Sequence, residues 1–377
     1  MKNYQRLGDY IREVNVRNSE LKVTKLVGLT IDKAFIPSVA NVIGTDLSNY
    51  KVIRKEQFAC SLMQVSRDGK MPVAMFEEDE AIMSPAYPMF EVVDKAELLP
   101  QYLMMWFSRK EFDREASFYA VGGVRGSLTW EDFCNLRLPI PSIARQREIV
   151  EEYETLSRRI RLNEQMIARL EETAQALYRK MFVDGIDKEN LPEGWRRGRL
   201  TDIASYLNGT ACQKFETDKK DFLPVLKIRE LSQGFCDDNS DHVETTIPKD
   251  FVVDDGDVIF SWSATLFIDI WCGGKCALNQ HLFKVSSSKY PKWFYFLWTQ
   301  NHIAGWKNLI SAKATSMGHI KREDLESAQV IIPSNSSLCE FDAQMGPAFD
   351  TYTIKKKENL KLTELQSLLL ARMGMQL

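Results

Sequence analysis

The clearest hydrophobic pattern in the chain is helical and runs through residues 143–181 without a Pro or Gly. At 1.5 Å per residue such a helix would be about 58 Å long. Its apolar residues recur every seven positions along two interleaved lines, which is the pattern of a coiled-coil seam. The first line holds Ile149, Leu156, Leu170 and Leu177, and the second holds Tyr153, Ile160, Ile167, Ala174 and Met181. Asn163 is the one polar residue in this seam.

The chain also repeats itself. Residues 128–142 are matched, without a gap, by residues 320–334 at an offset of 192. The same offset aligns Trp106 with Trp298, and Leu7-Gly8-Asp9 is matched by Leu200-Thr201-Asp202 one position further on. Such self-similarity indicates a tandem duplication, in which each copy is a globular part followed by a long helix.

The offset predicts a second seam near the C-terminus. It consists of Phe341, Met345, Ala348, Tyr352, Leu362, Leu369 and Met373, with Lys355 in the position of Asn163. Gly346-Pro347 should kink or restart this helix. The two helices could be unrelated amphipathic helices, each packed on its own domain. Spacing sustained over more than three heptads favours a pair of helices that acts as a spacer. The pair should be antiparallel, because a pseudo-two-fold axis between the two copies reverses one helix relative to the other.

Short apolar runs predict strands in both globular parts, at residues 52–53, 58–62, 72–76, 251–253, 257–260 and 281–285. Residues 100–118 and 292–310 are predicted helices. The predicted fold is therefore α+β: two similar mixed α/β domains, residues 1–142 and 183–335, separated by two long antiparallel coiled-coil helices, residues 143–182 and 336–377, in a pseudo-two-fold internal repeat.

Composition narrows the class of protein without naming a function. At 377 residues, 44% hydrophobic and 27% charged, the chain is typical of a two-domain globular protein. No apolar run is long enough to cross a membrane, and no signal peptide is expected. Seven cysteines, an odd number, favour reduced thiols and the cytoplasm. A net charge of −3 neither supports nor excludes a local DNA-binding face.

The sequence shows no motif for catalysis, and no catalytic residue or metal site is expected. There is no phosphate-binding loop, and none of the four histidines falls in a triad. Cys272 and Cys276 with His281 could form half of a zinc site, but a structural zinc needs four ligands. A turn with two buried thiols is favoured.

Several short sequence segments mark the two halves, and some of them occur in both halves in the same order. They are Leu7-Gly8-Asp9 and Leu200-Thr201-Asp202, Gly256-Asp257-Val258-Ile259, Leu278-Asn279-Gln280-His281-Leu282-Phe283, Leu138-Pro139-Ile140-Pro141 and Ile331-Ile332-Pro333, and Gln146-Arg147-Glu148-Ile149. Together they resemble the specificity subunit of type I restriction-modification systems, over essentially the whole chain. Two departures are Thr201 in place of the glycine, and Asn335-Ser336-Ser337 where the first helix has Gln146-Arg147-Glu148.

The resemblance implies two target-recognition domains, each of which reads half of a split double-stranded DNA site. It implies as partners two methylation subunits, which use S-adenosylmethionine, and restriction subunits, which use ATP and Mg. The chain itself would need no cofactor. Because the two domains are much less alike than the helices, the site should be asymmetric.

Base readout needs hydrogen-bonding groups in loops, with Arg and Lys on phosphates. Family-like DNA-facing loops fall at residues 64–70, 124–129, 262–264, 279–281 and 313–321. The candidates for phosphate or guanine contacts are Arg67, Lys70, Arg125, Lys313 and Lys321. The candidate base readers are Gln64, Ser127, Ser263, Gln280, Thr315, Ser316 and His319. For each of them the alternative is an ordinary solvated loop residue.

Two other functions remain open at this stage. One is a scaffold that joins other subunits without reading DNA, which salt-dependent DNA binding would separate from a specificity subunit. The other is an enzyme with an unfamiliar site, which methylation or cleavage by the purified chain would reveal.

Overall fold

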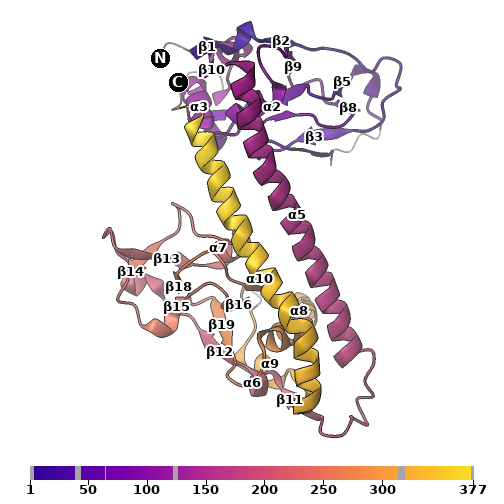
Figure 1. Ribbon diagram of the computed structural model, residues 1–377, viewed down its shortest axis with the longest axis vertical. Coiled ribbons are helices and arrows are strands. Elements are labelled where there is room, and N and C mark those ends of the chain that lie inside the picture. Colours follow the sequence, from indigo (N-terminus) through magenta and orange to yellow (C-terminus); the bar gives the residue numbers. More distant parts are fainter. Residues whose placement is uncertain (1–3, 39–43, 64, 122–125, 313–318, 375–377) are drawn as a thin grey trace. The chain divides into compact units, whose positions relative to one another are not determined.

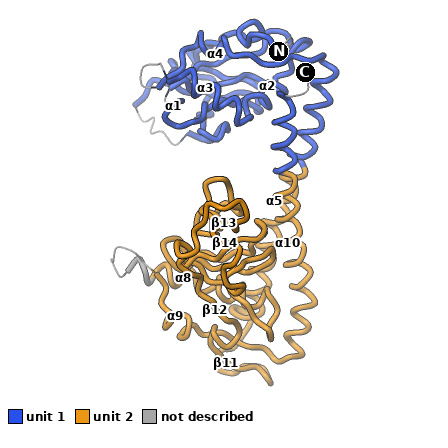
Figure 2. Tube along the Cα trace, turned by 90° about the vertical axis from the view of Figure 1, so that its left-hand side faces the viewer, with its two compact units in different colours: residues 1–158, 363–377 blue, residues 159–362 orange. Residues whose placement is uncertain are grey.

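The computed structural model describes residues 4–38, 44–63, 65–121, 126–312 and 319–374 (Figure 1). The chain divides into two compact units (Figure 2): unit 1 comprises residues 1–158 and 363–377, and unit 2 comprises residues 159–362. Each unit thus holds one globular part and a stretch of both long helices. The four-segment division expected from the sequence remains a prediction.

The same antiparallel four-stranded sheet occurs in both units and confirms the predicted repeat. In unit 1 its order is β2-β9-β6-β7, from Ile11–Glu13, Met89–Val92, Phe58–Cys60 and Val73–Met75. In unit 2 its order is β12-β19-β16-β17, from Ser205–Asn208, Leu282–Ser286, Val258–Ser261 and Phe267–Ile270. On the central strands Phe58 pairs with Phe90 and Phe260 with Phe283.

A further strand pair recurs in each unit and joins the start of a half to its end. It is β1 (Tyr4–Arg6) with β10 (Arg137–Pro139), and β11 (Arg196–Arg199) with β20 (Gln329–Ile332). A one-turn helix follows β1 and β11, at Leu7–Asp9 (η1) and Leu200–Ile203 (α6). The repeated Leu-x-Asp segments form these one-turn helices.

The remaining strands differ between the units. Unit 1 has β3 (Val27–Leu29) with β4 (Phe35–Pro37), and β5 (Lys51–Arg54) with β8 (Glu80–Met83). Unit 2 has a second four-stranded sheet of order β14-β13-β18-β15, from His242–Glu244, Phe222–Leu226, Cys276–Leu278 and Val252–Val253. In it, β13 and β18 run parallel, and α7 (Ile228–Gln233) follows β13.

The domain helices also differ in one respect from expectation. The predicted helix at 100–118 is two helices, α2 (Pro100–Phe107) and α3 (Lys110–Ala120), because Ser108 caps the first and Arg109 is extended. Its counterpart α8 (Lys292–Ala312) is unbroken. Short helices α1 (Val65–Asp68), α4 (Trp130–Asn135) and α9 (Arg322–Ser327) complete the domains.

The two long helices are α5 (Ile143–Phe182) and α10 (Asn335–Arg372). They pair antiparallel in each unit: Ser157 contacts Gln366 in unit 1, and Asn163 contacts Asn359 in unit 2. The helix does not restart at Gly346-Pro347, since Pro347 lies inside α10; the alternative, a kink there, stays a prediction. Ala343, whose carbonyl loses its partner at Pro347, is exposed, so water can satisfy it.

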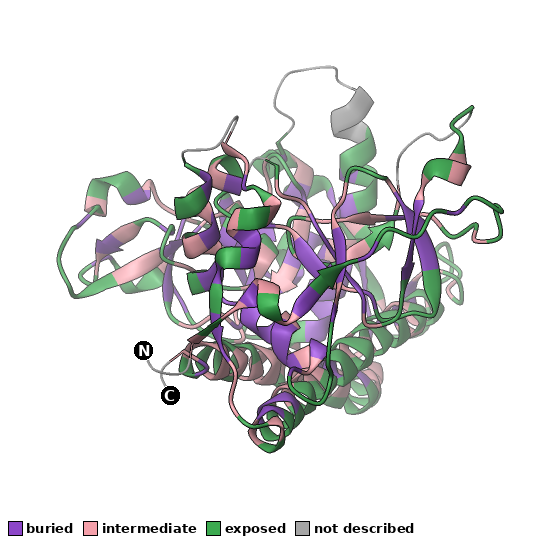
Figure 3. Cartoon of the chain, turned by 90° about the horizontal axis from the view of Figure 1, so that it is seen from above, coloured by how far each residue is buried: buried purple, intermediate pink, exposed green. Residues whose placement is uncertain are grey.

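Each long helix also contributes side chains to the hydrophobic core of both units. Ile149, Val150 and Met373 belong to the unit 1 core, and Tyr178, Phe182 and Met345 are among the helix residues in the unit 2 core. The strands of both units are largely buried (Figure 3). The spacer and domain-packing interpretations of these helices are therefore compatible.

Candidate nucleic-acid interface

In unit 1, two of the predicted DNA-facing loops are joined by hydrogen bonds. The Leu128 amide donates to the Leu62 carbonyl at 2.9 Å, and the Ser66 hydroxyl donates to the Gly126 carbonyl at 3.4 Å. Gly126 has a φ of +70°, and a Cβ there would lie 2.1 Å from Ser66 Oγ. Only glycine fits this approach. Ser127, next in the chain, is half-buried at this junction.

The same junction recurs in unit 2. Ile320, the counterpart of Leu128 at the offset of 192, donates its amide to the Trp262 carbonyl at 2.9 Å. Beside it, Ser263 and His319 form an isolated antiparallel β-bridge. The two units therefore share one backbone contact at equivalent positions: in unit 2 it joins two predicted loops, and in unit 1 it lies two residues before the predicted loop at 64–70, which is itself joined by the Ser66–Gly126 hydrogen bond. We call these contacts the unit 1 and unit 2 loop junctions.

Helix caps fix the chain just after both junctions. Thr129 Oγ1 accepts a hydrogen bond from the Asp132 amide at 3.0 Å and caps α4. The Lys321 amide donates to Asp324 Oδ2 at 2.8 Å at the start of α9. Each cap ties a loop to a helix that packs on the domain core through buried Phe133 or Leu325.

A third predicted loop meets the unit 2 junction. His281 lies beside Trp262, with the two rings 6.0 Å apart, and the His319 ring lies 6.0 Å from Trp262 on another side. Asn279 holds this loop on the domain, because its amide donates to the Leu226 carbonyl. Gln280 Oε1 is buried with no hydrogen-bond partner among the described residues. The structure thus places His281 and His319 beside Trp262, a side chain that was not singled out from the sequence; Ser263 follows Trp262 and bridges His319, and Gln280 precedes His281 in its loop.

A groove of about 1110 Å³ in unit 2 opens beside this junction. Its aromatic lining includes Tyr206, Trp262 and Phe283, and its basic lining is Lys289, Lys321 and Arg322. The Trp262 indole N–H donates to Asn208 Oδ1 at 3.1 Å, which orients the ring. An aromatic surface with cations beside it suits bases and phosphates of a nucleic acid. The signal in the sequence was a Trp between two serines directly after a buried strand.

The basic candidates of unit 1 are exposed and carry carboxylate partners. Arg67 donates to both oxygens of Asp68, at 2.6 and 3.1 Å, and this hydrogen bonding raises the pKa of Arg67 and lowers the pKa of Asp68. Lys70 Nζ donates to Asp32 Oδ1 at 2.9 Å. Both pairs are solvent-exposed and weak enough to exchange a carboxylate for a phosphate.

Five of the predicted contact residues lie outside the described residues. They are Gln64, Arg125, Lys313, Thr315 and Ser316. For these the sequence interpretation stands as a prediction.

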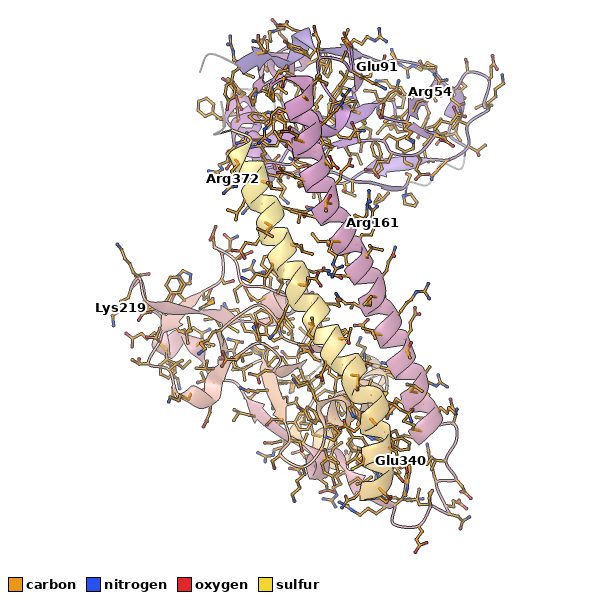
Figure 4. The ribbon with its side chains drawn as sticks, viewed as in Figure 1. Arg54, Glu91, Arg161, Lys219, Glu340 and Arg372 are labelled. Atoms are coloured by element: carbon orange, nitrogen blue, oxygen red, sulfur yellow. The ribbon has the colours of Figure 1, made fainter. Side chains whose placement is uncertain are left out.

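The predicted seam residues of α5 and α10 turn inward. Ile149 and Asn163 are buried, and the half-buried ones are Tyr153, Leu156, Ile160, Ile167, Leu170, Leu177, Lys355, Leu362 and Leu369. Arg161 lies on the exposed side of α5 (Figure 4). Asn163 Nδ2 donates to Asn359 Oδ1 at 2.8 Å, whereas Lys355 pairs with Glu358 on its own helix. The sequence pattern did not single out Asn359 as the partner of Asn163, although Asn359 lies seven positions after Tyr352 and continues the heptad line that runs from Met345.

No metal cluster or membrane helix is found in the part of the chain that the structure describes. No three His, Cys, Asp or Glu side chains there are grouped to hold a metal. Cys272 and Cys276 belong to different buried clusters, and burial raises the pKa of the Cys272 thiol to about 11. None of the described helices is long and apolar enough to span a bilayer.

Comparison with known proteins gives consistent matches. The family described as "Type I restriction modification DNA specificity domain" matches residues 62–172 and 192–366. The specificity subunit of the type I restriction enzyme MjaIX from Methanocaldococcus jannaschii is 23% identical over 306 residues, which is 75% of this chain and 70% of that protein.

One solved structure supports the fold. A type I restriction-modification S subunit from M. genitalium superposes with a TM-score of 0.59 at 11% identity, covering 98% of this chain and 95% of that one. The HsdS subunit from Thermoanaerobacter tengcongensis has a TM-score of 0.35 at 17% identity, with coverage of 98% and 95%.

Proposed function

The chain belongs to the type I restriction-modification DNA specificity family, and on that premise we propose that it reads a bipartite, asymmetric DNA site and directs adenine methylation and cleavage by partner subunits. One observation carries the proposal: the loop junction occurs twice, with different side chains around the same backbone contact. Ser66 and Arg67 stand at the unit 1 junction, and Trp262 and His319 at the unit 2 junction. Different donors and acceptors select different bases, so the two half-sites should differ.

We assign no chemical step to this chain. We expect S-adenosylmethionine to be bound by the two methylation subunits, and ATP with Mg by the restriction subunits. The chain would then position the DNA, by holding one stretch of it against the partner subunits that carry out the chemistry. Because the substrate is cellular DNA, the assembly would work in the cytoplasm.

A groove on the helix pair of unit 1 supports the partner assignment. It has a volume of about 560 Å³, and its apolar lining is Leu156, Leu365, Leu368 and Leu369. Leu365 is 49% and Leu368 53% exposed, which is unusual for leucines on neighbouring turns. The carboxylates of Glu148, Glu151 and Glu152 border the groove. This chemistry fits an amphipathic helix with basic edges, which we assign to a methylation subunit.

The test of function uses the complex reconstituted with its methylation subunits. Methylated positions are mapped by sequencing, and DNA affinity is measured at several salt concentrations. Arg67→Ala, Lys321→Ala, Arg125→Ala and Lys313→Ala should each weaken binding without affecting assembly. Loss of a phosphate contact should lower the salt slope by about one unit, and loss of a guanine contact should cost roughly 1–3 kcal/mol and relax one base.

Lys220→Ala, at an exposed lysine outside the junctions, is the matched control. A complex that assembles but binds DNA without sequence preference would support the scaffold alternative. Methylation or cleavage by the chain alone would show that it is an enzyme. Leu368→Lys should prevent assembly with a methylation subunit while the circular dichroism spectrum stays unchanged.

A further inference from the structure

One ionic cluster in unit 2 lies apart from the loop junctions and joins a strand to the seam residue Tyr352. Asp269, on strand β17, lies against the middle of α10. Lys356 Nζ donates to both Asp269 oxygens at 2.6 Å and to the Ile270 carbonyl at 3.0 Å. The Tyr352 hydroxyl donates to Asp269 Oδ1 at 3.0 Å. The Lys356 and Asp269 side chains are only 19% and 23% exposed.

The Tyr352 hydroxyl stays protonated at neutral pH. Burial, together with the nearby Asp269 and Glu171 carboxylates, raises the pKa of Tyr352, so its hydroxyl keeps the proton that it donates. Asp269 receives three hydrogen bonds from two donors on successive positions of one helix face. Removing one partner of a partly buried ion pair with this many hydrogen bonds lowers stability strongly, because the remaining charge is left without a partner.

Neighbouring contacts extend the cluster along the helix. The Cys272 thiol donates to the Thr353 carbonyl at 3.8 Å, and Lys357 lies 3.6 Å from Asp255. The domain loops at 255 and 269–272 thus contact α10 over residues 352–357. Elsewhere α10 contacts this domain through apolar packing, for example Phe349 against Phe296, and near its start through hydrogen bonds from the Trp293 indole to Asp342 at 2.7 Å and from the Trp195 indole to Ser337 at 3.3 Å.

Apolar and hydrogen-bonded contacts differ in how far they fix the position of the domain along α10. The hydrophobic effect is nondirectional, so apolar burial by itself does not require particular atoms to meet. A carboxylate that accepts hydrogen bonds from both Lys356 and Tyr352 is satisfied in one register only. In the middle of α10, the ionic cluster is therefore the contact that fixes the position of the second domain along the helix.

Unit 1 uses a different anchor. The loop junctions align Leu62 with Trp262 and hence Ala59 with Ile259; Ala59 pairs with Ala74 and Ile259 with Asp269, so the counterpart of Asp269 is the buried Ala74. The first domain is instead bound by the Gln146 amide, which contacts the Leu99 amide at 2.9 Å and the Glu97 carbonyl at 2.7 Å. The duplication preserved the sheet but not the attachment to the helices.

We propose that Asp269, Lys356 and Tyr352 form a positioning latch, which fixes the second recognition domain at one register on α10 and thereby restricts the spacer length that the complex accepts between its half-sites. The proposal rests on the proposed function. None of the three residues contacts DNA in it; they act by holding the domain that does.

The experiment uses the complex reconstituted with its methylation subunits and a set of DNA duplexes. The duplexes carry the two native half-sites at the native spacing and at spacings one and two base pairs shorter or longer. Variants are Asp269→Leu, Lys356→Met, the milder Tyr352→Phe, and the exchanged pair Asp269→Lys with Lys356→Asp. Glu244→Gln, which removes the exposed Lys219–Glu244 ion pair of the same unit, is the matched control.

With Asp269→Leu or Lys356→Met, methylation at the neighbouring spacings should rise roughly tenfold relative to the native spacing, which is the size expected when a partly buried ion pair loses a partner. The half-site sequences should not change. The exchanged pair should recover part of the native preference, and Glu244→Gln should behave as wild type.

Variants that assemble and keep the wild-type spacing preference would overturn the latch. If Asp269→Leu fails to assemble, Lys356→Met and Tyr352→Phe test the latch instead. The measurement is again the ratio of methylation at the neighbouring spacings to methylation at the native spacing. A wild-type complex without preference for any half-site sequence would instead contradict the proposed function, so the two failures are distinguishable.

Discussion

Gly126 shows how much a single position decides at the scale of the residue. Its positive φ and the 2.1 Å approach to Ser66 Oγ exclude a side chain. Gly126→Ala should therefore open the unit 1 loop junction and weaken recognition of one half-site, while the other is still recognised. Mapping of methylated sites on DNA libraries measures this directly.

Gly305→Ala is the control for that substitution. Gly305 lies exposed inside α8 with open space around its Cβ position. There alanine should raise the free energy of unfolding by roughly 0.5–1 kcal/mol and leave both half-sites unchanged. Equal effects of the two substitutions on recognition would mean that the junction does not position the reading loops.

Asn163 is the second residue whose role is testable alone. Its amide bonds to Asn359 inside the seam of unit 2. Asn163→Ala should lower the free energy of unfolding by about 1–3 kcal/mol, because a buried amide loses its partner. The double variant Asn163→Leu, Asn359→Leu should regain or exceed wild-type stability, since an apolar pair replaces a polar one. Urea unfolding of both variants gives the comparison; a double variant weaker than the single one would contradict it.

At the scale of the element, the pairing of α5 and α10 in unit 2 should depend on pH. Hydrogen bonds from Arg159 first and Lys355 second lower the pKa of Glu358 to about 2 from 4.5. A carboxyl with a depressed folded-state pKa adds stability above its unfolded pKa and loses it as pH falls towards the folded one. The contribution of Glu358 should therefore be complete at neutral pH and fade between about pH 4.5 and pH 2.

Thermal unfolding of Glu358→Gln against wild type tests this. The difference in Tm should be present at neutral pH and shrink through that acid range. Glu340→Gln, at an exposed glutamate near the start of α10 (Figure 4), is the control. A difference for Glu358→Gln that stays constant down to the acid limit would show that the ion pairs do not stabilise the helix pair.

At the scale of the whole molecule, each recognition domain should work independently. Replacing residues 183–335 with the equivalent domain of another family member should change one half of the recognised site only. The physical reason is that each unit has its own core and its own loop junction. Methylome sequencing of cells that carry the chimera reads both halves at once. Simultaneous change of both halves would contradict the modular interpretation.

The second prediction at this scale concerns length. One heptad inserted after Asn163 and one before Asn359 keeps the seam and the asparagine pair, and adds about 10 Å to the helix pair. The half-sites should then lie about three base pairs further apart, at roughly 3.4 Å per pair, with unchanged sequences. An active insertion variant that keeps the original spacing would show that these helices do not set the distance.

The sequence by itself determined the duplication, the two long helices, the seam residues of α5 and six of the short strands, namely β5, β6, β7, β15, β16 and β19. These follow from periodic local patterns and from self-similarity, which need no knowledge of long-range contacts. Only the tertiary structure decided that Trp262 lies between His281 and His319, that Asn163 meets Asn359, and that Asp269 binds Lys356 from 87 positions away. Such contacts depend on strand register and on how a domain packs against a helix. They leave no periodic trace in the chain, so the sequence could predict candidate reading loops but not the side chains that hold them.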